Sequence, residues 1–368
     1  MNNQTIYPVD TVGSFLLPET LITARQQHTQ GTLDQQQLHT AEDAAIKLLI
    51  ESQIEAGLTE VTTGEFRREK WDKDFWFGLN GIQCERVESG HIYQSLNAFS
   101  NVLRLSGAIA YNANHPFFDD FTFLYNITAG RARCRQTIPS PANLYLDILS
   151  MTNGHPEQIY PSDNNLLHDI AEAYNKTIQR FYELGCRHLQ IDDTACGLLC
   201  DVTYSTRLLQ GGINPVVLHE QIIGLLNDSI SNIPADMELS MYISGGDTII
   251  PKWENLDTHD SIMAKALSQV NVSKFFLPFR LDKKAQFNIL RHIPAGKKVV
   301  LGLIDAHYPL TERTADIHSA IKIASTFIAA NALSVSPKTG FKLTNYITRG
   351  LTYKDQWDKI SQLKKALS

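Results

Sequence analysis

The chain has 368 residues, of which 43% are hydrophobic and 20% are charged, and its formal net charge is −6. This composition is that of a soluble globular protein, and no segment approaches the ~18 consecutive apolar residues of a membrane span. A sequence pI near 6.1 leaves no basic field for a polyanion, which argues against nucleic acid and anionic membranes as partners.

Apolar segments of strand length alternate with longer amphipathic segments along the chain. The expected helices span residues 43–56, 167–184, 216–230 and 262–267, and the expected strands span 60–63, 188–191, 239–243, 274–277 and 299–304. Gly57, Gly185 and Gly296 stand where the helices that precede three of these strands should end, as C-cap glycines do. Steady alternation of helix and strand predicts a parallel sheet.

Residues 93–135 depart from this rhythm. Short alternating segments at 102–105 and 121–124 predict strands, so we expect a β-rich excursion that forms one wall of a binding site. No Pro/Gly/Ser linker and no repeat divides the chain, which favours one continuous domain over residues 1–368.

Polar residues follow the predicted strands. They are Glu65, Asp192, Asp193, Ser244, Asp305, His307 and Lys338. In a parallel α/β barrel the carboxyl ends of the strands converge on the face that carries active sites. This convergence favours a closed (β/α)₈ TIM barrel over an open, doubly wound sheet.

Asp192 and Asp193 end the same predicted strand, where alternation directs one side chain into the barrel mouth and the other away from it. One is therefore expected to be functional and the other structural. The structural alternatives are a helix cap at Asp192 and an ion pair between Glu65 and Arg67 or Arg68. Placement at strand ends favours a functional role for Asp192 and Glu65.

His307 also follows a predicted strand, with Asp305 two residues before it. A carboxylate at that spacing could orient the imidazole and raise its basicity, which suits a general acid or base near neutral pH. We therefore expect a catalytic His307, with Asp305 in the site.

Five motifs, taken in order, resemble the catalytic half of cobalamin-independent methionine synthase. They span residues 64–68, 189–193, 241–247, 302–309 and 335–341. The resemblance covers residues 12–341 and implies a TIM barrel of the methionine synthase/uroporphyrinogen decarboxylase type. It further implies that Asp192 and Glu65 hold the amino group of an amino-acid substrate, that Ser14 contacts its carboxylate, and that His307 supplies a proton.

The tract at residues 68–79 resembles the shorter stand-alone relatives of methionine synthase. Arg68, Trp71 and Trp76 could line a pocket for a planar or apolar substrate, or the aromatic residues could simply pack this loop onto the barrel rim. In the resembling family a tryptophan stacks on the pterin of the methyl donor. Asp147 stands at the matching position, which leaves folate binding open.

Four positions of the resembling family bind zinc through His, Cys, Glu and Cys. This chain has Tyr242, Ser244, Pro278 and Thr339 there, and none of them offers an imidazole, a carboxylate or a thiolate. The resemblance therefore implies a lost zinc site, and no metal cofactor is expected. Cys196 and Cys200, at helical spacing, form a rival metal pair without an obvious third or fourth ligand.

Four functions stay open at this point. The first is a metal-free transferase or lyase that uses acid/base chemistry on a small polar or amino-acid-like substrate. The second is a methyltransferase that makes methionine from homocysteine and a methyl-folate. The third is a non-catalytic ligand-binding or accessory barrel, and the fourth is a decarboxylase-like enzyme that uses Arg67, Arg68 and Asp192.

The cellular setting is expected to be the cytoplasm. The 5 cysteines are odd in number and scattered, which argues for reduced thiols, and the N-terminal residues lack the pattern of a signal peptide. The expected partner is a small-molecule substrate, and the chain could form a homo-oligomer. Dinucleotide, Walker and nucleophile-elbow motifs do not occur in it.

Overall fold

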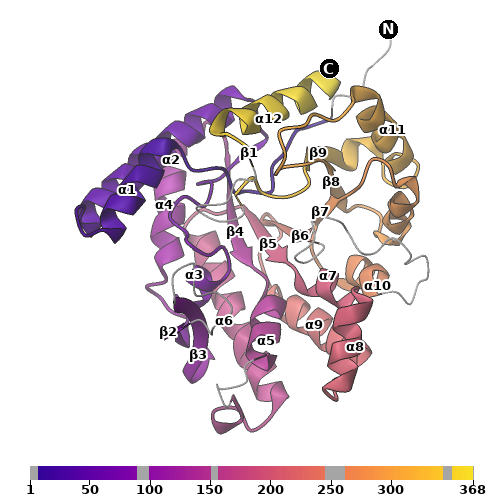
Figure 1. The fold of residues 1–368 in the computed structure, drawn as a ribbon. Coiled ribbons are helices and arrows are strands. Elements are labelled where there is room, and N and C mark those ends of the chain that lie inside the picture. The colour runs from indigo at the N-terminus through magenta and orange to yellow at the C-terminus, as the bar shows by residue number, and fades with distance from the viewer. Residues whose placement is uncertain (1–6, 89–98, 151–155, 245–261, 343–349, 368) are drawn as a thin grey trace.

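A parallel sheet forms the centre of the molecule, and helices surround it (Figure 1). The computed structural model describes residues 7–88, 99–150, 156–244, 262–342 and 350–367. Seven strands lie in the order β1-β4-β5-β6-β7-β8-β9, and each pairs in parallel with its neighbour. They are β1 (Glu60–Val61), β4 (Arg133–Pro139), β5 (His188–Asp193), β6 (Glu238–Ile243), β7 (Lys274–Pro278), β8 (Lys298–Ile304) and β9 (Leu333–Pro337).

The N-terminal segment lies between the two edge strands of this sheet. Val9 forms a parallel bridge with Val335 of β9, and the Asp10 N–H donates to the Val335 carbonyl at 2.8 Å. On the other side, the Thr59 N–H just before β1 donates to the Val9 carbonyl at 3.5 Å. The sheet is therefore a curled, seven-stranded one with a single bridge where the predicted barrel would have its eighth strand.

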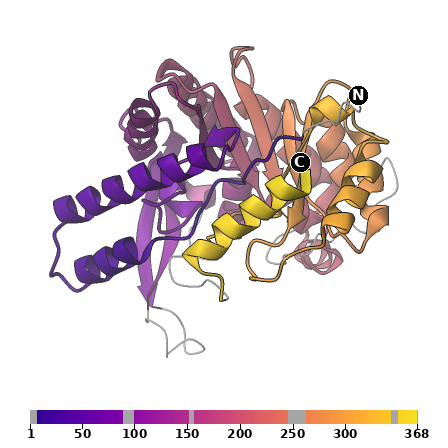
Figure 2. The same cartoon turned by 90° about the horizontal axis from the view of Figure 1, so that it is seen from above.

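Twelve α-helices occur among the described residues, and most of them connect successive strands. They are α1 (Glu19–Thr29), α2 (Gln35–Glu55), α3 (Lys73–Trp76), α4 (Pro116–Thr128), α5 (Pro141–Leu149), α6 (Asp163–Glu183), α7 (Ala195–Leu199), α8 (Val202–Gln210), α9 (Pro215–Ser229), α10 (Ile262–Gln269), α11 (Thr314–Ala324) and α12 (Tyr353–Leu367). Seen from above, the α1–α2 pair and α11 lie on opposite sides of the molecule (Figure 2).

Local sequence signals explain where these helices begin and end. Asp34 and Gln37 form a capping box that starts α2, and Asn214 caps α9, whose first residue is Pro215. Two of the three predicted C-cap glycines are confirmed: Gly57 and Gly185 directly follow the C-cap residues of α2 and α6, with positive φ of 64° and 97°. Gly296 also has a positive φ, of 90°, but the preceding 3-10 helix ends at His292, so Gly296 belongs to a turn before β8. Within the described residues, none of the helices combines the length and apolar character needed to cross a bilayer.

The predicted β-rich excursion is confirmed only in part. β2 (Asn80–Glu88) and β3 (Phe99–Ala110) form an antiparallel pair outside the main sheet, whereas β4 belongs to that sheet. Residues 93–98 of the predicted excursion lie outside the described residues.

The strand predicted at residues 121–124 is wrong, because these residues lie in α4. Phe117, Phe121 and Leu124 are buried at three- and four-residue spacing, which is the period of one helix face. Pro116 at the first helical position, and the His115 side chain that accepts from the Phe117 N–H, start the helix there. The short alternation of Phe and Thr resembled a strand only because a four-residue window cannot separate the two periods.

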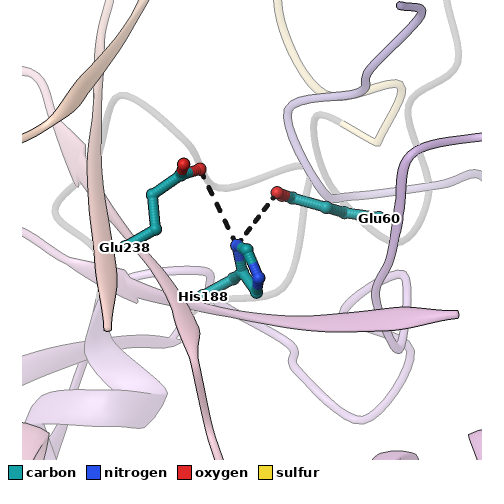
Figure 3. Close-up of side chains that lie close together, drawn as sticks. All are labelled: Glu60, His188 and Glu238. Carbon is teal, nitrogen blue, oxygen red and sulfur yellow. Dashed lines mark ion pairs between the residues drawn. The ribbon is translucent and has the colours of Figure 1, made fainter. Parts of the chain in front are cut away.

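Charged side chains fill the amino end of the sheet. This basal ion cluster consists of Asp10, Glu60, Arg135, His188, Glu238 and Lys274. Arg135 Nη1 lies 2.8 Å from both Asp10 and Glu60. Lys274 Nζ lies 3.1 Å from Glu60 and 2.7 Å from Glu238. His188 points between Glu60 and Glu238, with Nδ1 3.2 and 3.7 Å from their carboxylates (Figure 3).

The cluster neutralises charges that burial would otherwise penalise. Burial alone would raise the pKa of Glu60, but the nearby charges of Arg135, Lys274 and His188 outweigh it and hold that pKa well below its ordinary value. Burial also disfavours protonated His188, yet its bonds to Glu238 and Glu60 raise its pKa overall. The basal cluster is therefore a buried network of paired charges.

Arg135→Met should strongly destabilise the protein. The change leaves the Asp10 and Glu60 carboxylates buried next to an apolar side chain, which typically costs about 3–5 kcal/mol. The midpoint of urea unfolding at pH 7 measures the loss. Arg131→Met removes an exposed ion pair with Glu51 and should leave that midpoint nearly unchanged. Equal shifts in the two variants would contradict the importance of the basal cluster.

His188 should make stability depend on pH. Because its pKa in the folded protein is raised above 6.5, its stabilisation is complete below pH 6.5 and is lost as pH rises through the folded-state pKa. The difference in unfolding free energy between wild type and His188→Gln should therefore shrink with rising pH. His115 is a control of opposite sign, since burial lowers its pKa to about 4 and its contribution is lost as pH falls from 6.5. A pH-independent difference for His188→Gln would refute this account.

Candidate functional site

Most of the predicted site residues lie at the carboxyl ends of the parallel strands, opposite the basal ion cluster. Glu65 follows β1, Asp192 ends β5, Tyr242 lies in β6, Pro278 ends β7, His307 follows β8 and Thr339 follows β9. This end of the sheet is the candidate site, as it is in parallel barrels generally.

Asp192 and Asp193 point in opposite directions from the end of β5. The Asp193 carboxylate accepts from the Cys196 N–H at 2.8 Å and so caps the start of α7. Asp192 instead lies opposite Tyr242 in the register with β6, and both side chains are 8% exposed. Asp193 therefore caps α7, and Asp192 is the one of the two that faces the candidate site.

Asp192 lies in surroundings that favour its neutral form. Burial raises its pKa to about 8, with a further contribution from the Glu65 carboxylate, against the opposing effects of Gln190, Arg68 and Arg135. Burial, and then the charge of Asp192, also raises the pKa of Tyr242. At neutral pH both groups carry protons and can act as hydrogen-bond donors.

Glu65 forms a compact buried group with Arg68 and Thr137. The Thr137 hydroxyl donates to Glu65 Oε1 at 2.9 Å, and Arg68 Nη1 lies 3.1 Å from the same oxygen. Arg68 also donates to the Thr137 carbonyl at 2.6 Å and lies over the Phe117 ring at 4.5 Å. The pair with Arg68, which was the structural alternative for Glu65, therefore exists inside the candidate site.

Lys342 supports the backbone that carries Glu65, and the sequence analysis missed it. Gly64 and Glu65 both have left-handed backbone conformations, with φ of 65° and 60°. Such a conformation is unfavourable for Glu65, and here the Lys342 ammonium donates to the Glu65 carbonyl at 2.7 Å and to the Arg68 carbonyl at 3.2 Å. The only signal in the sequence was that Lys342 lies two residues after Gly340, which belongs to the motif at residues 335–341.

His307 contacts the residue that stands at a zinc position of the resembling family. Its Nε2 lies 3.2 Å from the Thr339 hydroxyl, and the His307 side chain is buried. Asp305, predicted to orient the imidazole, instead accepts from the His307 backbone N–H at 2.8 Å. A carboxylate two residues before an N–H readily closes such a local turn, so Asp305 holds the loop rather than the ring.

Ser14 lies against the loop after β9. Its hydroxyl donates to the Lys342 carbonyl at 3.4 Å, and a Cβ placed on Gly340 would lie only 2.0 Å from Ser14 Oγ. Gly340 is therefore required for this close approach, and it brings Ser14 to the same end of the sheet as Thr339.

The four predicted degenerate metal positions occupy the ends of β6, β7 and β9. A Cβ on Gly302 of β8 would lie 2.9 Å from the Lys338 Cα and 3.1 Å from the Pro278 Cα, so the ends of β7 and β9 approach each other across β8. Tyr242, Ser244, Pro278 and Thr339 supply hydroxyl groups and a pyrrolidine ring, which are not the usual zinc donors. Residues 245–247, the last three of the motif at residues 241–247, lie outside the described residues.

The predictions for Trp76 and for the pair of arginines, Arg67 and Arg68, need correction. Trp76 is 1% exposed and its indole N–H donates to the Tyr174 hydroxyl at 3.0 Å, so it packs α3 onto α6 and does not line the site. Trp71 is partly buried and stays a candidate. Arg67 pairs with Asp43 and Asp120, away from the strand ends, so of the two arginines only Arg68 reaches Glu65.

Clusters of metal-binding residues occur elsewhere among the described residues. His168, Asp169 and Glu172 lie on the surface of α6, and Glu60, His188 and Glu238 lie in the basal cluster, where Lys274 already provides the cation. The thiols of the pair Cys196 and Cys200 are held in their protonated form in the protein alone. Burial raises the pKa of Cys200 to about 12 and that of Cys196 well above its ordinary value, which opposes the thiolate form.

Sequence comparison relates this chain to known proteins. No protein-family model matches the chain. It is 31% identical over 355 residues to the uncharacterized protein YxjH of Bacillus subtilis, a match that covers 96% of this chain and 92% of YxjH. It is 20% identical over 343 residues to the methionine synthase of Sulfolobus acidocaldarius, covering 92% of this chain and 87% of that enzyme.

Solved structures extend the comparison. A candidate vitamin-B12-independent methionine synthase from Listeria monocytogenes superposes with a TM-score of 0.77 at 29% identity, covering 100% of this chain and 98% of the other. The chain belongs to the YxjH family, which is methionine synthase-like. A B12-independent methionine synthase from Shewanella sp. W3-18-1, in complex with selenomethionine, shares the fold at a TM-score of 0.71, with 20% identity and coverage of 98% and 97%.

Lys342 should make this methionine synthase-like protein more stable at alkaline pH. Burial lowers its pKa from 10.5 to about 8; the charge of Glu65 opposes this effect, and those of Arg25 and Arg68 add to it. Between these two values the unfolded chain binds more protons than the folded one, so the unfolding free energy should rise. Lys342→Met should lack that rise in urea titrations from pH 7 to 10.5. An unchanged pH profile would show that Lys342 is not buried as described.

Proposed function

We propose that this protein is a methionine synthase-like enzyme that works without zinc, using acid/base chemistry on a small polar or amino-acid-like substrate. The comparisons support a methyltransferase-like family, and the reaction proposed is transfer of a methyl or alkyl group, or cleavage of a bond that needs only protonation. Asp192, Glu65 and Ser14 would hold the substrate, and His307 would move the proton.

One observation carries the proposal. The His307 Nε2 lies 3.2 Å from the Thr339 hydroxyl, at the position where the resemblance expects a cysteine ligand. A metal-bound thiolate there would place a cation beside the imidazole and disfavour its protonation. A neutral hydroxyl group only hydrogen-bonds to the ring, so no metal ion opposes a proton on His307, and the imidazole is available as the proposed acid or base.

The surroundings of Asp192 support the same acid/base chemistry. The pKa of Asp192 is about 8, so this group is mostly protonated at pH 7 in the free protein, with Tyr242 facing it. A substrate ammonium group next to Asp192 would favour the carboxylate, because an opposite charge lowers a carboxyl pKa. The site can thus accept a cationic amino group beside Asp192.

A methyl transfer in this site needs one proton to be moved. The acceptor would lose its proton to His307 as its bond to the methyl group forms, while the bond between the methyl group and the donor breaks and its electron pair stays on the donor atom. His307 would then return the proton to that atom, so that the net reaction moves one methyl group and one proton in opposite directions. Zinc normally makes a thiol acceptor reactive by converting it to a thiolate. The proposed site therefore suits an acceptor that a general base alone can activate.

The second candidate is synthesis of methionine from homocysteine, which is favoured by the name of the relative from Sulfolobus acidocaldarius and by the structure from Shewanella sp.. Metal analysis of the purified protein and turnover assays with homocysteine and methyl-folate separate the two. Stoichiometric zinc together with methionine production would end the metal-free proposal. The decarboxylase-like alternative loses support because Arg67 is paired with Asp43 and Asp120.

Asp192→Asn and His307→Asn should each lower kcat/KM by at least about 100-fold in whichever assay detects turnover, since each removes a proposed acid/base or substrate-holding group. The matched control is Asp193→Asn, which changes the adjacent carboxylate on the opposite side of β5. This control should lower stability while the activity of the folded fraction stays near wild type. Full activity in both site variants would favour the accessory-protein interpretation.

A further inference from the structure

Gln190 lies directly beneath Asp192 in the sheet interior. It is two residues earlier in β5, so both side chains are on the same face, and it is fully buried. Its Nε2 lies 2.6 Å from the Val12 carbonyl and 2.6 Å from Asp192 Oδ1. One amide nitrogen therefore serves two acceptors, with one hydrogen for each.

The Val12 carbonyl determines the orientation of this amide. The oxygen and nitrogen of a glutamine amide can exchange places by a half-turn, and only the hydrogen-bond partners show which arrangement is present. The reversed arrangement would place Gln190 Oε1 against the Val12 carbonyl, and neither oxygen could donate. The nitrogen must therefore face Val12 and, with it, Asp192.

We propose that Gln190 is a positioning residue that determines which oxygen of Asp192 carries the proton. Because Nε2 donates to Oδ1, Oδ1 is an acceptor and the proton resides on Oδ2, the oxygen that does not face Gln190. A ligand at the mouth of the sheet then meets an O–H donor of defined direction. The use of that proton in catalysis rests on the proposed function, but its placement does not.

Several groups besides Gln190 influence Asp192. Burial raises its pKa to about 8 and the Glu65 carboxylate raises it further, whereas the bond from Gln190 and the charges of Arg68 and Arg135 lower it. Tyr242 faces Asp192 from β6 as a neutral group. Replacing Gln190 by an apolar residue removes a hydrogen-bond donor to Asp192 without changing the net charge. The effect of that donor can therefore be measured separately from the effects of the neighbouring charges.

A carbon-13 NMR titration of the Asp192 carboxyl group tests the proposal without any substrate. The signal is assigned by its absence in Asp192→Asn, and the wild-type midpoint should lie near pH 8. Gln190→Met removes a hydrogen bond to the carboxylate and should raise the midpoint, with a roughly three- to tenfold gain in proton affinity. An unchanged midpoint in the folded variant would overturn the proposal.

Two further variants guard against trivial explanations. Gln356→Met is the matched control, because this buried glutamine also holds the N-terminal segment, through the Leu16 N–H, but the structure gives it no bond to Asp192. Its midpoint should equal that of wild type, and an equal shift would show that loosening of the segment is the cause. Gln190→Leu also removes the donor without adding a charge, so it should raise the midpoint as well, and it decides the matter if Gln190→Met does not fold.

Failure of this proposal and failure of the proposed function give different results. If Asp192→Asn keeps full activity while Gln190→Met shifts the titration, Gln190 positions a proton that the reaction does not use. If neither Gln190 variant shifts the titration, the positioning role is wrong whatever the activity of Asp192→Asn.

Discussion

Pairing of the Arg135 guanidinium with Asp10 and Glu60 is the interaction that ties the N-terminal segment to the base of the curled sheet. Arg135 is fully buried in β4, Glu60 begins β1, and Asp10 lies in the segment that bridges β9. Arg135 also donates to the Thr11 carbonyl. A buried guanidinium needs all its partners, because an unpaired charge in the interior is costly. The pairing therefore holds the N-terminal segment between the first and last strands.

Above the basal ion cluster, the interior of the sheet is lined first by apolar side chains and then, at the carboxyl ends of the strands, by titratable ones. Val12, Tyr242, Phe276 and Val300 form a separate buried cluster, and the Phe276 ring lies 5.0 Å from the Arg135 guanidinium. Tyr242 of this cluster faces Asp192, and the Gln190 amide lies beneath it; burial is the largest cause of the raised Asp192 pKa. The same strands thus deliver paired charges at one end and a neutral, proton-carrying carboxyl group at the other. This contrast between paired charges at one end of the sheet and a neutral carboxyl group at the other suits the proposed site, which would bind by hydrogen bonds and transfer protons.

Local patterns predicted much of this arrangement, and their failures have physical causes. Alternation along β5 predicted that Asp192 and Asp193 point in opposite directions, and strand-end placement predicted that Glu65 and His307 lie at the carboxyl ends of the strands. The four-residue segment at 121–124 was too short to distinguish strand from helix. The two-residue spacing of Asp305 and His307 fits a bond to the imidazole and a local turn to the backbone N–H equally, and the structure shows the turn. Trp76 was assigned to the site by its composition, but its burial against Tyr174 depends on how α3 meets α6.

The sequence by itself determined five of the seven parallel strands, the C-cap glycines Gly57 and Gly185 and the polar residues at the strand ends, because hydrophobic period and turn chemistry act over a few residues. Only the tertiary structure decided that Val9 bridges Val335, that Lys342 supports the backbone of Glu65, and that the Val12 carbonyl orients Gln190. These contacts join residues far apart in the chain. They form because buried polar groups must find partners, and which partners lie within reach is known only once the sheet has curled.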